Sequence, residues 1–129
     1  MNAVTNTIAA WPAPAQALAE TVAALIHEEA VSAEVGPLTE TLKWGEPSFL
    51  TETTKAGTTI RLAWKPKKPN VLQLLVHCQT TLIDDWRSRF PDLHFDGNRA
   101  LLLALDTPLP EPELRLCLRS ALTYHKAKP

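Results

Sequence analysis

The residues of this chain with the clearest chemical potential lie between Lys43 and Ser48, where four functional groups fall within six positions. They are an ammonium, an indole ring, a carboxylate and a hydroxyl, carried by Lys43, Trp44, Glu46 and Ser48. Together these groups can donate and accept hydrogen bonds and stack on a flat surface. We therefore expect them to contribute to a ligand-binding site.

A second candidate is the alternating row Asp92, His94 and Asp96. In a strand all three side chains would point to one side, and such a row could hold a divalent cation. The same alternation is typical of the solvent face of a half-buried strand, whose other face would hold Leu93 and Phe95. The sequence leaves both interpretations open.

His77 and Cys78 are adjacent, so in a strand their side chains face opposite ways and cannot readily share a metal ion. We expect a partnered histidine and a buried free thiol, and the other cysteine, Cys117, should also be a buried free thiol. Because the sequence has no further Cys–His cluster, it does not predict a structural zinc site.

Polar residues follow this strand as Gln79, Thr80 and Thr81, where a helix should begin. Backbone N–H groups at a helix start can receive an anion. Arg99, which follows Asn98 after a predicted hairpin turn, could supply a cation if strand ends converge, as could Lys43 and Lys65. The alternative is that Thr81 only caps the helix. We count Gln79, Thr80, Asn98 and Arg99 among the candidate ligand-binding residues.

Two further features have two interpretations each. Trp44 and Trp64 could line a pocket or partner site, or they could belong to the core. Glu29 interrupts an apolar helical stripe, so it either reaches solvent near the helix end or is buried and paired with Lys43 or Arg61.

The elements that must position these residues follow from periodicity. A helix should begin at Pro14, and a second, short helix should run from Pro37 to Gly45, where Pro47 prevents it from resuming. Alternation predicts strands over residues 48–53, 58–64, 71–78, 93–95 and 99–105. Amphipathic spacing predicts further helices over residues 81–90 and 114–125.

This order, α-α-β-β-β-α-β-β-α, predicts an α+β fold. We expect a two-layer α/β sandwich in which helices pack on a mainly antiparallel, five-stranded sheet. A chain of 129 residues fits one domain, which we place at residues 14–129 after an N-terminal lead-in of residues 1–13. The pattern does not determine the order of the strands.

Composition limits the classes of partner. Apolar residues make up 45% of the chain, charged residues 21%, and the net charge is -1, so nucleic acid and acidic membranes are not expected partners. The sequence has neither a signal-peptide pattern nor an apolar run of roughly 18–20 residues, so we expect a cytoplasmic protein. It also contains no nucleophile elbow, dinucleotide fingerprint or phosphate-binding glycine loop, and nothing argues for catalysis.

Several segments, taken in order, resemble the YdhG-like family of small bacterial domains of unknown function. They are Lys43-Trp44-Gly45-Glu46-Pro47-Ser48, Ile60-Arg61-Leu62-Ala63-Trp64-Lys65-Pro66, His77-Cys78-Gln79-Thr80-Thr81, Phe90-Pro91-Asp92-Leu93, Gly97-Asn98-Arg99-Ala100 and Ala121-Leu122-Thr123-Tyr124-His125. The resemblance covers about residues 15–126 and implies an α/β sandwich. One branch of the family resembles frataxin, an iron-binding chaperone, which implies iron as a ligand. Frataxin-like binding uses a ridge of carboxylates, whereas the exposed helical stripe expected here offers Glu20 and Glu28.

The sequence therefore favours a non-enzymatic domain that binds an unknown small ligand or protein in a cleft between the second helix and the sheet. The alternatives are a frataxin-like iron chaperone and a small enzyme of unknown reaction. No cofactor is predicted, apart from the iron that the resemblance implies, and the oligomeric state stays open.

Overall fold

The computed structural model describes residues 2–126, which form four helices and one six-stranded sheet. In chain order the elements are α1 (Ala3–Ala9), α2 (Ala13–Ser32), β1 (Thr39–Lys43), β2 (Glu46–Leu50), β3 (Ile60–Ala63), β4 (Val71–Leu75), α3 (Leu82–Arg89), β5 (His94–Asp96), β6 (Ala100–Ala104) and α4 (Glu111–Leu122). The predicted α+β class is confirmed, whereas the predicted strand count and element order are not matched.

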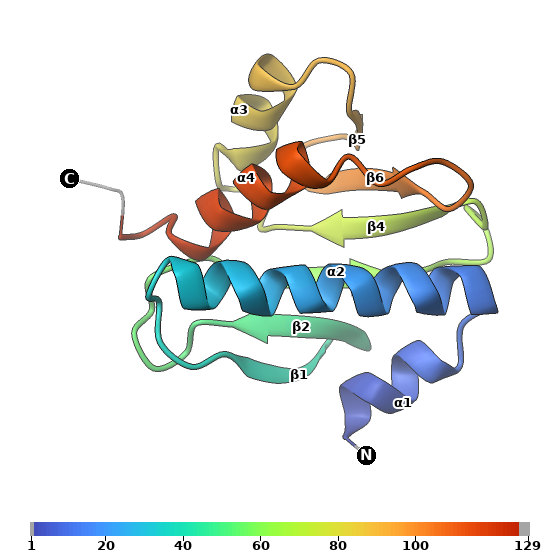
Figure 1. The fold of residues 1–129 in the computed structure, drawn as a ribbon, viewed down its shortest axis with the longest axis horizontal. Helices are drawn as coiled ribbons and strands as arrows, with labels where there is room; N and C mark the ends of the chain where they lie inside the picture. Colours follow the sequence, from blue (N-terminus) through green and yellow to red (C-terminus); the bar gives the residue numbers. More distant parts are fainter. Residues whose placement is uncertain (1, 127–129) are drawn as a thin grey trace.

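The strands lie in the order β1-β2-β3-β4-β6-β5, and every neighbouring pair is antiparallel. Helices α2 and α4 lie side by side over one face of this sheet (Figure 1). None of the helices within residues 2–126 combines the length and the apolar character needed to cross a membrane.

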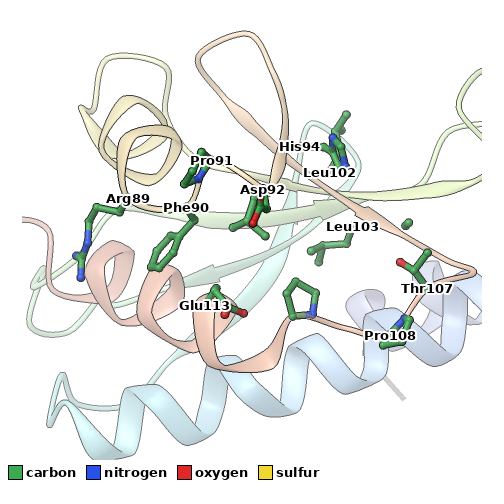
Figure 2. A pocket seen from close by; sticks show the side chains of 13 residues that line it. Arg89, Phe90, Pro91, Asp92, His94, Leu102, Leu103, Thr107, Pro108 and Glu113 are labelled. Carbon is green, nitrogen blue, oxygen red and sulfur yellow. The ribbon is translucent and has the colours of Figure 1, made fainter.

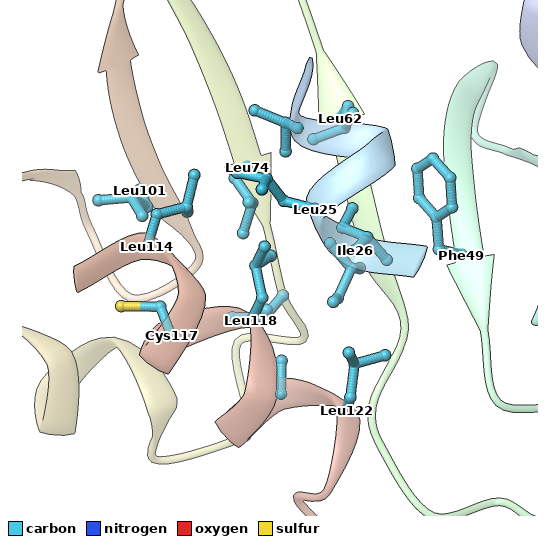
Figure 3. Packing of buried hydrophobic residues seen from close by; sticks show 14 of the residues in the cluster. Leu25, Ile26, Phe49, Leu62, Leu74, Leu101, Leu114, Cys117, Leu118 and Leu122 are labelled. Carbon is cyan, nitrogen blue, oxygen red and sulfur yellow. The ribbon is translucent and has the colours of Figure 1, made fainter. Parts of the chain in front are cut away.

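The core lies between these helices and the sheet face that they cover. Because strand side chains alternate between faces, every second residue of β2, β3, β4 and β6 points into it. Figure 3 shows this packing, to which the labelled residues Leu25, Ile26, Phe49, Leu62, Leu74, Leu101, Leu114, Cys117, Leu118 and Leu122 contribute. The opposite face forms a separate cluster of sheet residues only: Ala63, Leu75, Ala100 and Leu102.

The predicted helix between Pro37 and Gly45 is wrong, because this segment contains strand β1. Its residues pair with β2, from Thr39 opposite Leu50 to Lys43 opposite Glu46. Gly45 therefore does not end a helix. It is the second residue of a two-residue hairpin turn, and pairing with β2 satisfies the backbone groups that helical bonds would otherwise satisfy.

The N-terminal segment that we expected to be a lead-in contains helix α1. The Asn2 side chain caps this helix by accepting a hydrogen bond from the Thr5 backbone N–H at 2.8 Å. Val4 and Ile8 lie one turn apart and are both buried in the core. The helix has only seven residues, which is too short for its periodicity to stand out in the sequence.

The ends of several elements also differ from the predicted ones. The strand predicted over residues 71–78 ends at Leu75. The alternation that placed Cys78 inside therefore stops, and this thiol is exposed, whereas Cys117 is buried as predicted. The Thr81 side chain makes no capping bond at the start of α3, and it hydrogen-bonds Asp85 instead at 3.1 Å.

Candidate functional site

A groove of about 390 Å³ lies on the side of the sheet away from the helices. The register aligns Ser48, Arg61, Leu75 and Ala100 in one row across β2, β3, β4 and β6. Directly paired antiparallel residues point to the same face, so this row is opposite to the face that holds Phe49. We call this cavity the sheet groove; its lining residues are Trp44, Glu46, Arg61, Leu75, Val76, His77, Cys78 and Arg99.

A half-buried ion network forms part of the groove wall. Glu46 accepts a hydrogen bond from Arg61 Nη1 at 3.0 Å and lies 3.3 Å from Lys65 Nζ, while its own side chain is only 12% exposed. Glu46 is the one carboxylate among the described lining residues, and both of its oxygens already contact cations. Positive charge is therefore in excess in this region.

Arg99 adds a guanidinium that has no hydrogen-bond or ion-pair partner among residues 2–126. Its backbone carbonyl accepts a hydrogen bond from the Val76 N–H at 2.9 Å, which ties the residue to the end of β4. Its charge has a longer-range attraction to Asp96. The side chain can therefore donate to a ligand without first losing a bond within the described structure.

His77 adds a third donor to the groove. Its Nδ1 accepts the backbone N–H of Gln79 at 3.0 Å. A ring nitrogen that accepts a hydrogen bond carries no proton, so the ring proton lies on Nε2. With Arg61 and Arg99, His77 gives this surface hydrogen-bond donors that suit an anionic oxygen.

Trp44 lies at the rim in a strained backbone conformation. Its φ is 56° and that of Gly45 is 76°, so the two residues form a type I′ hairpin turn. Glycine adopts this left-handed region at little cost, whereas a residue with a side chain loses about 1–2 kcal/mol there. The Trp44 side chain is 88% exposed, so packing within the described structure does not offset the strain.

The groove brings together three of the residues that the sequence predicted: Trp44, Glu46 and Arg99. The other residues predicted near this corner have different roles. Lys43 is exposed opposite Glu46 in the hairpin, and Ser48 is fully buried with its hydroxyl donating to the Glu46 carbonyl at 2.9 Å. The expected cleft between a helix over residues 37–45 and the sheet is not formed, because this segment contains strand β1. The groove instead lies on the sheet face that the helices leave uncovered.

The remaining predicted ligand-binding residues lie outside the groove lining. Trp64 is half-buried against the core and donates to the Pro69 carbonyl at 3.1 Å, so it belongs to the structure of the domain. Gln79 and Thr80 form a turn around His77, in which Thr80 Oγ1 donates to the His77 carbonyl at 2.8 Å. Asn98 is exposed in the turn between β5 and β6.

At the start of α3, where the sequence predicted an anion site, one backbone N–H already has a partner within the protein. The Thr81 backbone N–H donates to the Tyr124 hydroxyl at 3.3 Å.

Glu29 has partners other than the expected Lys43 or Arg61, because it lies 3.0 Å from Arg115 Nη1 and 3.8 Å from Arg119 Nη1. Both contacts join segments that are far apart in sequence.

The three residues of the predicted metal row, Asp92, His94 and Asp96, do not come together at one site. His94 and Asp96 lie on β5, but Asp92 precedes this strand in a turn, and Asp96 accepts a hydrogen bond from Lys68 at 2.6 Å. Within residues 2–126, no group of three or more His, Cys, Asp and Glu side chains is placed to hold a metal ion. On α2, the carboxylates of Glu28 and Glu29 both pair with Arg115, so their charges are already compensated within the protein.

Asp92 and His94 instead line a second cavity of about 460 Å³, between β6, the start of α4 and the turn after α3 (Figure 2). Its walls are largely leucine, proline and phenylalanine side chains. Its charged groups are Arg89, Asp92 and Glu113, which have opposite signs. This mixture favours no single charge class of ligand, in contrast to the sheet groove.

Sequence reasoning did not include Arg61, His77 and Cys78 among the site residues. The alternation in residues 58–64 did place Arg61 on the face opposite Ile60 and Leu62, which was the available signal. Placing Arg61 and Arg99 in the same groove also required the order β3-β4-β6, which local periodicity does not encode.

Comparison with known proteins adds no relative, because no protein-family model, curated protein or solved structure matches this chain. The resemblance to the YdhG-like family therefore stays a prediction.

Proposed function

We propose that this protein is a non-enzymatic binding domain whose sheet groove binds a small organic anion, with a carboxylate or phosphate as its anionic group. The observation that carries the proposal is the Arg99 guanidinium, which lines the groove without an ion-pair partner among residues 2–126. The Nε2–H of His77 and the remaining N–H groups of Arg61 support the same chemistry. Guanidinium groups match planar, two-oxygen anions especially well.

The charge balance supports an anion over a cation. Glu46 already pairs with Arg61 and Lys65, so a cation that approached it would be repelled by both side chains or would have to displace one of them. Breaking either contact would leave a half-buried carboxylate with less compensation. An anion can be bound with this network intact, because its oxygens would meet donors that are still available.

The test is a titration of the isotopically labelled protein with small monocarboxylates, dicarboxylates and phosphate monoesters, followed by amide NMR shifts. We expect the shifts to centre on Arg61, Leu75, His77 and Arg99, and we expect affinity to fall as salt is added. Arg99→Gln should weaken binding about tenfold or more, because charge-assisted hydrogen bonds contribute about 1.5–3 kcal/mol.

Arg89→Gln is the matched control. This arginine has its guanidinium 5.5 Å from the Phe90 ring and lines the other cavity, so its loss should leave anion binding unchanged. The proposal fails if no anion of the series shifts the groove residues, or if both arginine variants weaken binding equally.

A further inference from the structure

Trp44 combines two properties that folding alone does not explain. Its backbone has a φ of 56°, where a residue with a side chain is strained, and its side chain is 88% exposed. Asparagine or glycine would form the same type I′ turn with less strain. The hairpin therefore contains a large aromatic side chain at a position where the fold favours a small one.

No hydrogen bond or stacking contact within the described structure compensates for this strain. The Trp44 indole N–H has no hydrogen-bond partner among residues 2–126, and no aromatic ring of that range stacks on it. By contrast, the indole N–H groups of Trp64 and Trp86 donate to Pro69 and Ser120. The indole N–H of Trp11 also has no partner among residues 2–126, but this side chain packs against the core. Trp44 thus differs from the other three tryptophans, which all contribute to the fold.

The position of Trp44 connects this strain to the groove. Trp44 lines the same cavity as Arg61, His77 and Arg99. An indole face binds flat rings by offset stacking, and the donors bind an anionic oxygen. We infer that the groove selects anions that carry an aromatic ring, with the ring against Trp44 and the carboxylate or phosphate at Arg99 and its neighbours.

This inference rests on the proposed function and adds the class of ligand to it. Strained residues persist where the surrounding structure fixes them, and they gather at sites that hold ligands in a set geometry. Here the paired Lys43 and Glu46 fix the turn on both sides. This pairing fixes the backbone of the turn before the ligand arrives, which lowers the entropic cost of binding.

The test compares phenylacetate with cyclohexylacetate, and phenyl phosphate with inorganic phosphate, by calorimetry or NMR titration. We expect the wild-type protein to bind the ring-bearing member of at least one pair about two- to tenfold more tightly. Preference in the first pair identifies carboxylates, and preference in the second identifies phosphate monoesters. Trp44→Phe should keep the preference, and Trp44→Asn should abolish it.

Trp44→Asn should also raise the melting temperature by about 2–5 °C, because it introduces the dipeptide that type I′ turns favour. Lys55→Asn is the matched control, since Lys55 has the same φ of 56° but lies outside the groove. It should also raise the melting temperature, because asparagine tolerates the left-handed region better than lysine, and it should leave binding unchanged.

The outcomes separate the two proposals. If anions bind through Arg99 but wild-type protein shows no ring preference, or if Trp44→Asn keeps it, the inference is wrong and the proposed function stands. A lower melting temperature in Trp44→Asn would mean that the ring stabilises the fold, which also overturns the inference. If none of the four probes binds, the inference is wrong, and the wider anion series then decides whether the proposed function stands.

Discussion

At the scale of single residues, the two cysteines have opposite environments. Cys117 is fully buried in α4, and this burial raises the pKa of its thiol to about 12, with Glu113 acting in the same direction and Arg89 against it. Cys78 is exposed in the sheet groove. Because the thiolate is the reactive form, burial and a high pKa both protect Cys117 at neutral pH.

We therefore predict that a disulfide reagent at pH 7–8 modifies one thiol of the native protein within minutes and the second only after denaturant is added. Absorbance of the released thiol counts the reacted groups. In Cys78→Ser the rapid native reaction should disappear. Rapid modification of both thiols in the folded wild type would show that α4 opens more readily than its burial implies.

Gly57 offers a second prediction at this scale. A side chain there would collide with the backbone of Leu122 at the end of α4, where Thr58 N–H also donates to the Ala121 carbonyl at 2.9 Å. Gly57→Ala should cost about 3 kcal/mol of unfolding free energy or more, because backbone atoms have little room to shift. Denaturant unfolding measures this loss.

Gly97→Ala is the control for Gly57. Gly97 has a φ of 59° and open space around it, so the substitution should cost only the backbone strain, about 1 kcal/mol. Equal losses in the two variants would contradict the close approach of Gly57 to α4.

At the scale of elements, one arginine joins α2 to α4. Arg115 contacts Glu28 at 2.9 Å, Glu29 at 3.0 Å and Glu111 at 3.1 Å. These hydrogen bonds raise the pKa of Arg115, in the order Glu28, Glu29 and Glu111. Glu29 is the most buried of the three carboxylates, with a side chain only 13% exposed, so it depends most on this partner.

Arg115→Met should lower the melting temperature by a few degrees, because it leaves the Glu29 carboxylate half-buried with Arg119 at 3.8 Å as its nearest cation. Adding Glu29→Met should recover part of the loss, since the uncompensated charge is removed with it. Calorimetric melting of the two single variants and the double variant measures this coupling. Strictly additive losses would show that the contact contributes little.

The pairing of Lys68 with β5 predicts a pH dependence. The hydrogen bond and the charge of Lys68 lower the pKa of Asp96, and Arg99 adds to this. A carboxylate with a lowered folded pKa stabilises the fold fully above its unfolded pKa, and this contribution is lost as pH falls through the folded value. Lys68→Ala should raise the Asp96 pKa toward its ordinary value, as measured by carboxyl NMR between pH 2 and 6. An unchanged titration would contradict the pairing.

At the scale of the whole molecule, α1 contributes to the core. Ile8 and Val4 are 5% and 3% exposed, and the helix packs against β1 and β2. Ile8→Ala should therefore lower the unfolding free energy by about 2–4 kcal/mol, as for other buried isoleucines. Asn6→Ala, on the exposed side of the same helix, is the control and should change stability little. If both variants are neutral in denaturant unfolding, α1 is separable from the domain.

The sequence allowed much of the fold to be predicted, where local periodicity was strong. The alternation through Ile60 and Leu62 placed their side chains correctly, and the helical spacing of Ile83 and Trp86 did so in α3. The prediction of secondary structure was wrong between Thr39 and Gly45, because proline and glycine can flank either a helix or a hairpin. At the candidate site, the sequence singled out Trp44, Glu46 and Arg99 but not their neighbour Arg61.

By itself, then, the sequence determined the α+β class, most of the side chains that face the core, and the chemical types available for a site. These depend on the spacing of neighbouring residues, which the backbone geometry of helices and strands makes regular. Only the tertiary structure decided that Arg61 and Arg99 share one groove, because strand order and register depend on contacts between distant segments. It also decided the conformation of Trp44, because pairing between β1 and β2 fixes the turn that strains it.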